Sequence, residues 1–505
     1  MLENDKSRRN TAEANDNECI GNKDFAAAGI FFLYCCLYAV LRLSISSTME
    51  MDESEQFLDG SFLAFGYARQ PPFYSWLVYG MAKLFGLNIQ TIIATKYIIM
   101  FFFCFSFYLI ARSFWNMRTS LLITGTLLIF PTYSYEFNRD LSHSILVTTM
   151  ASITCYIFVR LLRRGRTSDY LLLGASTGIG FLSKYNFAFF LLALLLAALS
   201  LSEGRRAFFN KKIFLSFTSF VLIVSPHVIW LYQNDFLPFR HSLAKADAGV
   251  LDLSSAGQIF HVIISSYYGV LVFLMICFIF FGFNISWPNL RHGSKSRLNF
   301  FYYLSLYGLT IPLLVIPIFK TGHFSERWLA PILFSLPLAV FSGAGMQANS
   351  RRFKLLGYLC IFIAVAIFAV RSFIGFFPDI SGKAERVHTP FRYVSQQLRQ
   401  ELAMRGIDDS RDITIISGNE YLAANVAAWL PGEKKYLLHG DHRIAKSMSG
   451  SGVKLLLWEA AKKGEDIPNE YARDFTSVLL LRPSRASFLH SSNLPPFVLG
   501  AALVQ

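Results

Sequence analysis

Long apolar segments constrain this chain more strongly than any other feature of its sequence. Stretches of about 20 mainly apolar residues, the length of a helix that crosses a bilayer, recur from residue 26 to residue 377. Hydrophobic residues make up 53% of the 505-residue chain, and 50 residues are phenylalanine, which excludes an ordinary soluble protein. The sequence predicts a polytopic α-helical membrane protein with about eleven transmembrane helices. The predicted helices cover 26–46, 90–112, 119–135, 141–162, 169–182, 184–202, 213–233, 259–283, 299–319, 328–346 and 354–377.

The basic residues predict how these helices cross the membrane. The net charge of +14 comes from short clusters between apolar segments, such as Arg163-Arg164 and Arg205-Arg206, and not from one basic domain. This pattern argues against a nucleic-acid partner, and the positive-inside rule predicts that residues 1–24 form a cytoplasmic tail. Because this tail has no apolar core and no cleavage site, we expect the first apolar segment to be retained. The transmembrane domain then covers 25–378.

One pair of predicted helices, 169–182 and 184–202, could also be a single long helix. Gly178, Gly180 and Asn186 favour a break between the two. Merging the pair would reverse every later loop and move the basic clusters outside, so we expect two helices. The acidic and mixed polar clusters then collect on the non-cytoplasmic side, which indicates a single site there.

The first outer loop, 47–89, contains a notable acidic stretch, Met51-Asp52-Glu53-Ser54-Glu55-Gln56-Phe57. Its spacing predicts a short amphipathic helix that continues to Phe65, with Asp52 and Asp59 on one face and Phe62 and Phe65 on another. Such a helix would lie on the membrane and present acids to a cavity. The alternative is a solvated first turn, where acidic residues are also favourable.

A change in composition after the last apolar segment predicts a small α/β domain over 379–505. Helical patterns at 393–405 and 421–430 alternate with β-like runs at 413–416, 453–457 and 478–481. Gly450-Ser451-Gly452 is too short to indicate a phosphate loop and is interpreted as a turn. None of the seven cysteines forms a CxxC pair, so neither structural disulfides nor a cysteine metal site is predicted.

Four motifs carry a resemblance to a known family. They are Asp52-Glu53; Pro71-Pro72-Phe73-Tyr74-Ser75-Trp76-Leu77; Gly178-Ile179-Gly180-Phe181-Leu182-Ser183-Lys184-Tyr185; and Ser225-Pro226-His227-Val228-Ile229-Trp230 followed by Gln233-Asn234-Asp235-Phe236. In this order and on one membrane face, they resemble the membrane glycosyltransferases of the GT-C fold. The superfamily is that of the lipid A aminoarabinose transferase and the protein O-mannosyltransferases, and the resemblance is greatest to a bacterial lipopolysaccharide-modifying branch that includes galacturonosyltransferases. The resemblance covers roughly the first 330 residues.

The resemblance implies an inverting glycosyltransferase in the bacterial inner membrane. It would move a sugar from a polyprenyl-phosphate donor to lipopolysaccharide, on lipid A or core, with the active site and the C-terminal domain in the periplasm. Two positions depart from the family pattern. Arg69 and Gln70 stand where relatives have an acidic residue implicated in metal binding, which puts a divalent metal, the one cofactor considered, in doubt. His143-Ser144 stands for a His-Asp pair, so Asp140 or Glu136 would supply the second acid.

Transfer of a sugar from a lipid phosphate needs a base for the acceptor hydroxyl and positive charge for the departing phosphate. Asp52 is the preferred base, and Glu53 is the second choice or serves as a ligand or an orienting group. Asp140 is either a third catalytic acid or a helix N-cap. Arg69 and Lys184 are predicted to bind the phosphate, against the alternatives of headgroup anchoring and snorkelling. Further candidates for substrate binding are Tyr74, Arg240, His241, Lys320, His323 and Arg327.

Two other functions compete with this interpretation. A transporter or lipid flippase would also have many spans, but such proteins usually carry mid-membrane charges and internal repeats. Here only Lys96 is prominent within a span, and no repeat is evident. A protein O-glycosyltransferase of the same superfamily is the closer alternative. The C-terminal domain could bind the acceptor or serve as a structural cap.

Overall fold

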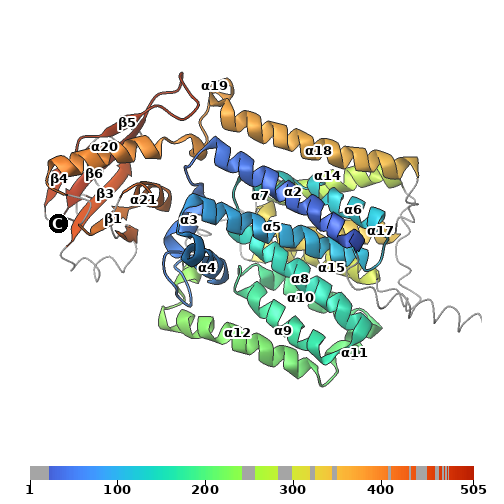
Figure 1. Ribbon diagram of the computed structural model, residues 1–505. Coiled ribbons are helices and arrows are strands. Elements are labelled where there is room, and N and C mark those ends of the chain that lie inside the picture. Colours follow the sequence, from blue (N-terminus) through green and yellow to red (C-terminus); the bar gives the residue numbers. More distant parts are fainter. Residues whose placement is uncertain are drawn as a thin grey trace, which may run out of the picture.

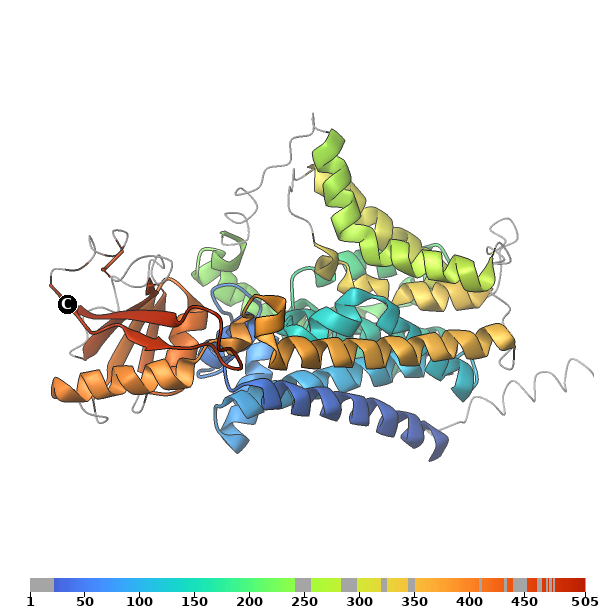
Figure 2. The same cartoon turned by 90° about the horizontal axis from the view of Figure 1, so that it is seen from above.

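The computed structural model describes residues 22–240, 256–282, 298–318, 325–343, 350–407, 411–430, 434–438, 452–460, 466–468, 471, 475 and 477–504. Helices form an elongated bundle, and a small sheet domain lies at one end of it (Figures 1 and 2). The bundle consists of α2 (Asn22–Ile45), α3 (Met51–Asp59), α4 (Phe73–Phe85), α5 (Ile89–Arg112), α6 (Met117–Gly125), α7 (Phe137–Arg139), α8 (Ser142–Arg164), α9 (Thr167–Phe181), α10 (Phe187–Leu199), α11 (Ser202–Phe208), α12 (Ile213–Gln233), α14 (Ala256–Phe281), α15 (Asn299–Ile318), α16 (Ala330–Leu333), α17 (Ser335–Gly343) and α18 (Arg351–Phe376). Short turns η2 (Thr126–Ile129), η3 (Thr132–Glu136) and η4 (Glu326–Trp328) connect some of them.

Six helices among the described residues are long and apolar enough to cross a membrane, or up to seven if the bent pair α10 and α11 is one span. Every predicted apolar segment coincides with one helix or with a group of shorter helices, such as α16 and α17 for 328–346. The prediction of a polytopic helical membrane protein is therefore confirmed. The count of eleven spans stays a prediction.

A break separates α9 from α10, as predicted from the glycines. Helix α9 ends at Phe181, and α10 begins at Phe187. A Cβ atom on Gly180 would lie 2.3 Å from the ring of Phe187, so only glycine lets the two helices approach this closely. The residues between them, including Lys184, face the end of the bundle that adjoins the sheet domain.

The helix of the first outer loop is shorter than predicted. Helix α3 ends at Asp59, so Phe62 and Phe65 do not belong to it and the expected apolar face beyond Leu58 is wrong. The physical reason is Gly60, the C-cap of α3, because glycine is unfavourable inside a helix. Close packing keeps glycine at this position, since a Cβ atom there would lie 2.5 Å from the side chain of Val78 in α4. Six of the nine residues of α3 are buried, so the helix is an internal element of the bundle rather than a surface helix.

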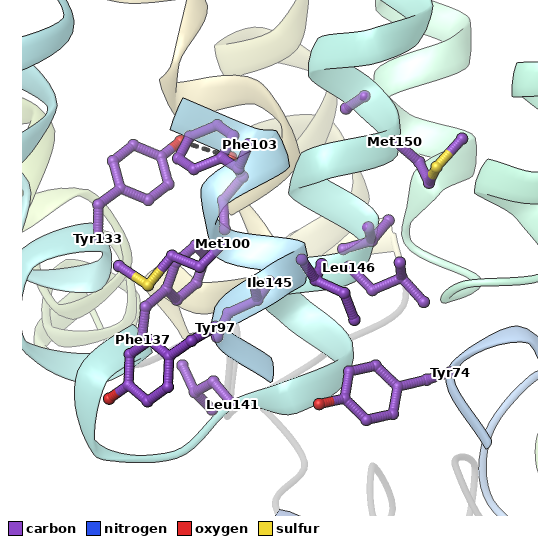
Figure 3. Close-up of a cluster of buried hydrophobic side chains, with 14 of the residues drawn as sticks. Tyr74, Tyr97, Met100, Phe103, Tyr133, Phe137, Leu141, Ile145, Leu146 and Met150 are labelled. Atoms are coloured by element: carbon purple, nitrogen blue, oxygen red, sulfur yellow. Dashed lines mark hydrogen bonds between the residues drawn. The ribbon is translucent and has the colours of Figure 1, made fainter. Parts of the chain in front are cut away.

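A tightly packed apolar core lies between α5 and α8, next to the end of the bundle that adjoins the sheet domain. Tyr97, Met100 and Phe103 of α5 lie against Ile145 and other residues of α8 (Figure 3). The hydroxyl of Tyr133 donates a 2.6 Å hydrogen bond to the carbonyl of Ala330, the dashed line in Figure 3, and so ties η3 to α16. Because such interiors are close-packed, α5 and α8 hold the neighbouring polar residues of the first outer loop in fixed positions.

The C-terminal elements form a mixed sheet covered by two helices. They are α19 (Pro378–Ser381), η5 (Arg386–His388), α20 (Phe391–Met404), β1 (Ile413–Ser417), α21 (Glu420–Ala427), β2 (Lys434–Leu438), β3 (Val453–Glu459), β4 (Val478–Leu480), β5 (Ser484–Ala486) and β6 (Phe497–Val504). The strand order is β2-β1-β3-β6-β4, with β5 paired to β6. Strand β1 is parallel to β2 and β3, and β6 is antiparallel to β3.

One face of this sheet belongs to the same contiguous apolar core as the helical bundle. Ile415, Leu455 and Leu457 are fully buried in that core, whereas Ile416 and Leu456 on the other face form a separate cluster. This alternation is the period of two expected of strands buried on both faces. The three predicted strands and both predicted helices are present, while β2, β5 and β6 were not predicted.

Candidate active site

Glu53 of α3 is buried and forms an ion pair with Arg42. The Arg42 side chain, at the end of α2, donates from Nε and Nη2 to the two Glu53 carboxylate oxygens over 3.2 and 2.5 Å. Glu53 Oε2 also accepts the backbone N–H of Glu50, the N-cap of α3, at 2.8 Å. Burial alone would raise the pKa of Glu53, but the charge of Arg42 outweighs it and lowers that pKa. All of these contacts give Glu53 a structural role at the start of α3.

Asp140 lies directly against the start of α3. The backbone N–H of Asp52 donates to Oδ1 of Asp140 over 3.2 Å. Asp140 is not a cap for its own helix, because the N-cap of α8 is Leu141 and no side chain caps it. The free N–H groups in the first turn of a helix favour a carboxylate there. Burial raises the pKa of Asp140 well above its usual range, and the charges of Asp52 and Glu50 raise it further.

A strained backbone conformation directs Asp140 toward α3. Leu141 has φ 64° and ψ 42°, in the left-handed region that a leucine rarely adopts. This conformation costs about 1–3 kcal/mol and persists only where the surroundings enforce it. Here the Leu141 side chain is buried in the core of Figure 3, which fixes the turn. The alternative acid, Glu136, instead pairs with Arg139 at 2.8 Å.

Asp52 is the most accessible of the three predicted acids. It is half-buried, whereas Glu53 is 0% exposed and Asp140 is 6% exposed. Its carboxylate makes no ion pair with any residue that the structure describes. Asp52 is therefore the least buried carboxylate of this group.

A chain of buried polar side chains connects four segments beside the acids. Ser75 of α4 donates to Gln56 Oε1 over 3.0 Å, and Gln56 Nε2 donates to His143 Nε2 over 2.8 Å. His143 Nδ1 then lies 3.4 Å from the carbonyl of Ser183. This arrangement keeps the imidazole in one tautomer and holds α3, α4, α8 and the loop before α10 together.

Lys184 and Arg327 supply positive charge on the same side. The Lys184 ammonium donates to Ser144 Oγ over 2.8 Å. Its loop is tied to η4 because Asn186 Nδ2 donates to the carbonyl of Trp328 over 3.1 Å. Burial lowers the pKa of Lys184 to about 8; the charge of Asp52 opposes this shift and that of Arg327, an exposed residue, adds to it. Two cations held near each other without a described ion pair are suited to an anionic ligand.

The remaining predicted residues are placed differently. Arg69 pairs with Glu420 of α21 at 2.5 Å, so a residue of the C-terminal domain holds its guanidinium. Tyr74 is fully buried, with its ring centroid 5.2 Å from that of His143, which indicates packing rather than substrate contact. Arg240 is exposed beyond the end of α12. His241, Lys320 and His323 lie outside the described residues.

Lys96 is a further charged residue near the acids. It is 0% exposed within α5, and its ammonium has no hydrogen-bond partner among the described residues. Its charge interacts with those of Glu53, Asp140 and Asp52. The sequence showed Lys96 as the one prominent charge inside an apolar segment, and that signal could have placed it here.

The described residues do not fit a metal site. They contain no group of three or more histidine, cysteine, aspartate or glutamate side chains that could hold a metal ion. Arg69 stands in the position of the expected acidic ligand and is itself held by a carboxylate. No catalytic step is therefore assigned to a metal.

Comparison with known proteins places this geometry in a family. A family model described as dolichyl-phosphate-mannose-protein mannosyltransferase matches residues 69–230. The lipopolysaccharide core galacturonosyltransferase RgtB of Rhizobium johnstonii is 30% identical over 453 residues, which cover 87% of this chain and 88% of that protein. This chain belongs to the GT-C glycosyltransferase family of the lipopolysaccharide core galacturonosyltransferases.

Other members and a solved structure agree with this family assignment. RgtA of the same organism, also named a lipopolysaccharide core galacturonosyltransferase, is 29% identical over 418 residues, or 79% of each chain. The crystal structure of ArnT from Cupriavidus metallidurans bound to undecaprenyl phosphate has a TM-score of 0.57 at 12% identity, covering 95% of this chain and 98% of that one. It shows the same GT-C fold. As a member of the family, the chain is a glycosyltransferase and a multi-pass membrane protein.

Proposed function

We propose that this glycosyltransferase moves a sugar from a polyprenyl-phosphate donor to lipopolysaccharide, on lipid A or core, at the periplasmic face of the bacterial inner membrane. The observation that carries the proposal is the half-buried Asp52, whose backbone N–H donates to Asp140 Oδ1 and whose carboxylate lies in the field of Lys184. The names of the two relatives support a lipopolysaccharide acceptor. The undecaprenyl phosphate in the ArnT structure supports the class of donor.

In the proposed reaction, the acceptor hydroxyl attacks the anomeric carbon of the donor sugar. Asp52 takes the hydroxyl proton while the new C–O bond forms. The bond between the anomeric carbon and the phosphate oxygen breaks, and its electron pair leaves with the lipid phosphate. Because the base and the leaving group act on opposite faces of the sugar, the configuration at the anomeric carbon inverts.

Asp140 supports the base in this scheme. It holds the first turn of α3 by accepting the Asp52 N–H, which fixes the direction of the Asp52 side chain. Its raised pKa leaves it protonated more readily than an ordinary aspartate, so the two neighbouring carboxyl groups need not both be charged.

The lipid phosphate is proposed to lie between Lys184 and Arg327. The prenyl chain of the donor stays in the bilayer, so its phosphate reaches the protein at the membrane edge. Lys184 lies in the break before α10, and the Asn186 hydrogen bond holds that loop against η4. Charge-assisted contacts from the two cations would stabilise the phosphate as it departs. Arg69 would contribute only after it is released from Glu420.

Transfer with purified components tests this function directly. Full-length protein in detergent, given a polyprenyl-phosphate sugar and lipopolysaccharide, is expected to form a new glycosidic bond. Mass spectrometry of lipopolysaccharide from a deletion strain should show the loss of one sugar residue. Lipopolysaccharide of unchanged mass in that strain would contradict the proposed acceptor.

A protein O-glycosyltransferase is the second candidate, because the matching family model is described as a protein mannosyltransferase. The same deletion strain separates the two. Loss of a sugar from a protein, with intact lipopolysaccharide, would favour the second candidate.

The proposed topology is a cytoplasmic tail at residues 1–24, a transmembrane domain at 25–378 and a periplasmic domain at 379–505. Fusions after Gly382 test it, since alkaline phosphatase should be active there and green fluorescent protein should be dark. Bright fluorescence after Gly382 would overturn the orientation and the site with it.

A further inference from the structure

A helix of the C-terminal domain rests on the helix that carries Asp52. Helix α21 packs against α3, as Figure 1 shows where the sheet domain meets the bundle. The contact joins parts of the chain that lie about 370 residues apart, since Asn425 contacts Ser54. It therefore cannot follow from local sequence and depends on how the two domains dock.

Asn425 is the centre of this contact and is 1% exposed. Its Oδ1 accepts the backbone N–H of Met49 at 2.8 Å, and its Nδ2 donates to the carbonyl of the same residue at 3.2 Å. Nδ2 also lies 3.2 Å from Ser54 Oγ and 2.9 Å from the carbonyl of Tyr421, so its two hydrogens are shared among three acceptors. One buried side-chain amide thus contacts both backbone groups of Met49 and a side chain of α3.

Two other contacts from the C-terminal domain reach the same loop. Thr48 Oγ1 donates to the carbonyl of Thr389 over 2.7 Å. Glu420, in the first turn of α21, pairs with Arg69 at 2.5 Å. The first outer loop is therefore fixed by the C-terminal domain on both sides of α3.

These contacts bear on catalysis because Met49 lies next to the first turn of α3, which carries Asp52. Met49 directly precedes Glu50, the N-cap of α3, and Asp52 is the second residue of that helix. A shift of Met49 would move the first turn of α3 and change the direction of the Asp52 carboxyl relative to Asp140. Ion pairing of Glu53 with Arg42 fixes α3 from the side of α2, and Asn425 fixes it from the opposite domain.

We propose that Asn425 is a positioning residue, which makes the C-terminal domain a working part of the active site rather than a separate acceptor-binding module. The inference rests on the proposed role of Asp52 as the base. A base misplaced by about 1 Å can lower the rate by about 10²-fold. Asn425→Ala is therefore expected to lower kcat by about 10- to 100-fold, with little change in KM for donor or acceptor.

The test compares Asn425→Ala with a control variant, Gln397→Ala, that removes a similar pair of side-chain to backbone hydrogen bonds elsewhere in the domain. Gln397 also clasps one residue, donating to the carbonyl of Arg485 and accepting its N–H, each over 2.9 Å, but it does not touch α3. Full-length proteins in detergent are assayed for kcat and KM with a polyprenyl-phosphate sugar. Gln397→Ala should retain the wild-type kcat.

Hydrogen exchange provides a readout that general destabilisation would not give. In Asn425→Ala, amides of residues 48–54 should exchange faster while those of α5 remain protected. If Asn425→Ala does not fold, Ser54→Ala removes one Asn425 contact from the side of α3 and should lower kcat by a smaller factor. A raised KM with an unchanged kcat in either variant would overturn the inference and favour an acceptor-binding module.

Asp52→Asn, assayed in parallel, separates this inference from the proposed function. Full turnover in Asp52→Asn would show that Asp52 is not the base, and it would overturn both the proposed mechanism and the positioning role of Asn425. Loss of turnover in Asp52→Asn, combined with a wild-type kcat in Asn425→Ala, overturns the positioning role alone.

Discussion

Both ends of the helical bundle contain acidic residues paired with arginines, and they differ in the charged residues that lie beside these pairs. At the distal end, away from the sheet domain, Asp169 pairs with Arg160 at 2.7 Å and Asp24 pairs with Arg112 at 3.2 Å. At the end beside the sheet domain, the carboxylate of Asp52 and the cations Lys184 and Arg327 make no ion pair with described residues. Matched charges at the distal end stabilise helix ends. The uncompensated charges at the other end are in the right place to act on a substrate.

The contrast also exists within α3. Two neighbouring acids, Asp52 and Glu53, point into different surroundings, and Glu53 resembles the distal acids because Arg42 binds both of its oxygens. An acid that is completely paired contributes to stability, whereas one that is half-buried and unpaired can exchange a proton with a ligand. Each prediction below tests whether this difference separates function from stability.

Asp52→Asn should have the largest effect on turnover. Removal of a catalytic base typically lowers the rate by ~10²–10⁴-fold, while loss of an unpaired carboxylate should hardly change the melting temperature. Transfer rate and thermal unfolding are measured on the same preparation. Wild-type turnover in this variant would remove Asp52 from the mechanism.

Lys184→Ala should weaken use of the donor. A charge-assisted contact to phosphate contributes about 1.5–3 kcal/mol, which corresponds to a roughly 10- to 150-fold loss at about 1.4 kcal/mol per decade. Transfer rate against donor concentration measures it. Lys83→Ala is the matched control, because the Lys83 ammonium lies over the ring of Tyr79, 5.1 Å from its centroid. If the donor dependence of Lys184→Ala is unchanged, Lys184 does not bind the donor phosphate and only extends to the membrane interface.

The pH dependence of donor binding should reveal the charge of Lys184. With its pKa lowered to about 8, the ammonium is charged below that pH and neutral above it. KM for the donor should therefore rise as the pH increases through about 8. Lys184→Arg should remove this rise, since arginine stays charged. The same upward trend in Lys184→Arg would assign the titration to another group.

Asp169→Asn at the distal end should have the smallest effect on turnover. It removes the negative charge that pairs with the partly exposed Arg160 from the buried Asp169 position, which costs about 1–3 kcal/mol and lowers the melting temperature. Turnover per folded molecule should stay at the wild-type level. A loss of turnover comparable to that of Asp52→Asn would erase the distinction between the two ends.

The features that could be predicted from sequence are those with a local signal. Apolar length predicted the helices, and the glycines before Lys184 predicted the break that places it beside Ser144. The expected convergence of the outer loops, together with the family resemblance, selected Asp52, Asp140 and Lys184, and the structure brings these residues near one another. Their roles in the reaction stay a prediction. The predicted length of α3 was wrong because the apolar spacing of Phe62 and Phe65 was given more weight than Gly60, the C-cap of the helix.

The features that could not be predicted depend on long-range contacts. Two such contacts are the ion pair of Arg69 with Glu420 and the hydrogen bonds of Asn425 to Met49. Each joins residues more than 340 positions apart, and neither residue type nor spacing predicts it. The buried Tyr74 illustrates the same point, because a tyrosine beside a motif can lie in the core or in the site. Only the packing of α4 against α8 decides between these positions.

The clasp of Asn425 has a consequence for the biogenesis of the enzyme. Asp52 is synthesised early and enters the membrane with the first helices, but α21 leaves the ribosome only after all the apolar segments have been made. In the proposed topology, the C-terminal domain must also be exported and folded before Asn425 can reach Met49. A newly inserted chain would therefore turn over slowly, by about the 10- to 100-fold expected for Asn425→Ala, until translocation is complete, so that incompletely exported molecules would consume little lipid-linked sugar.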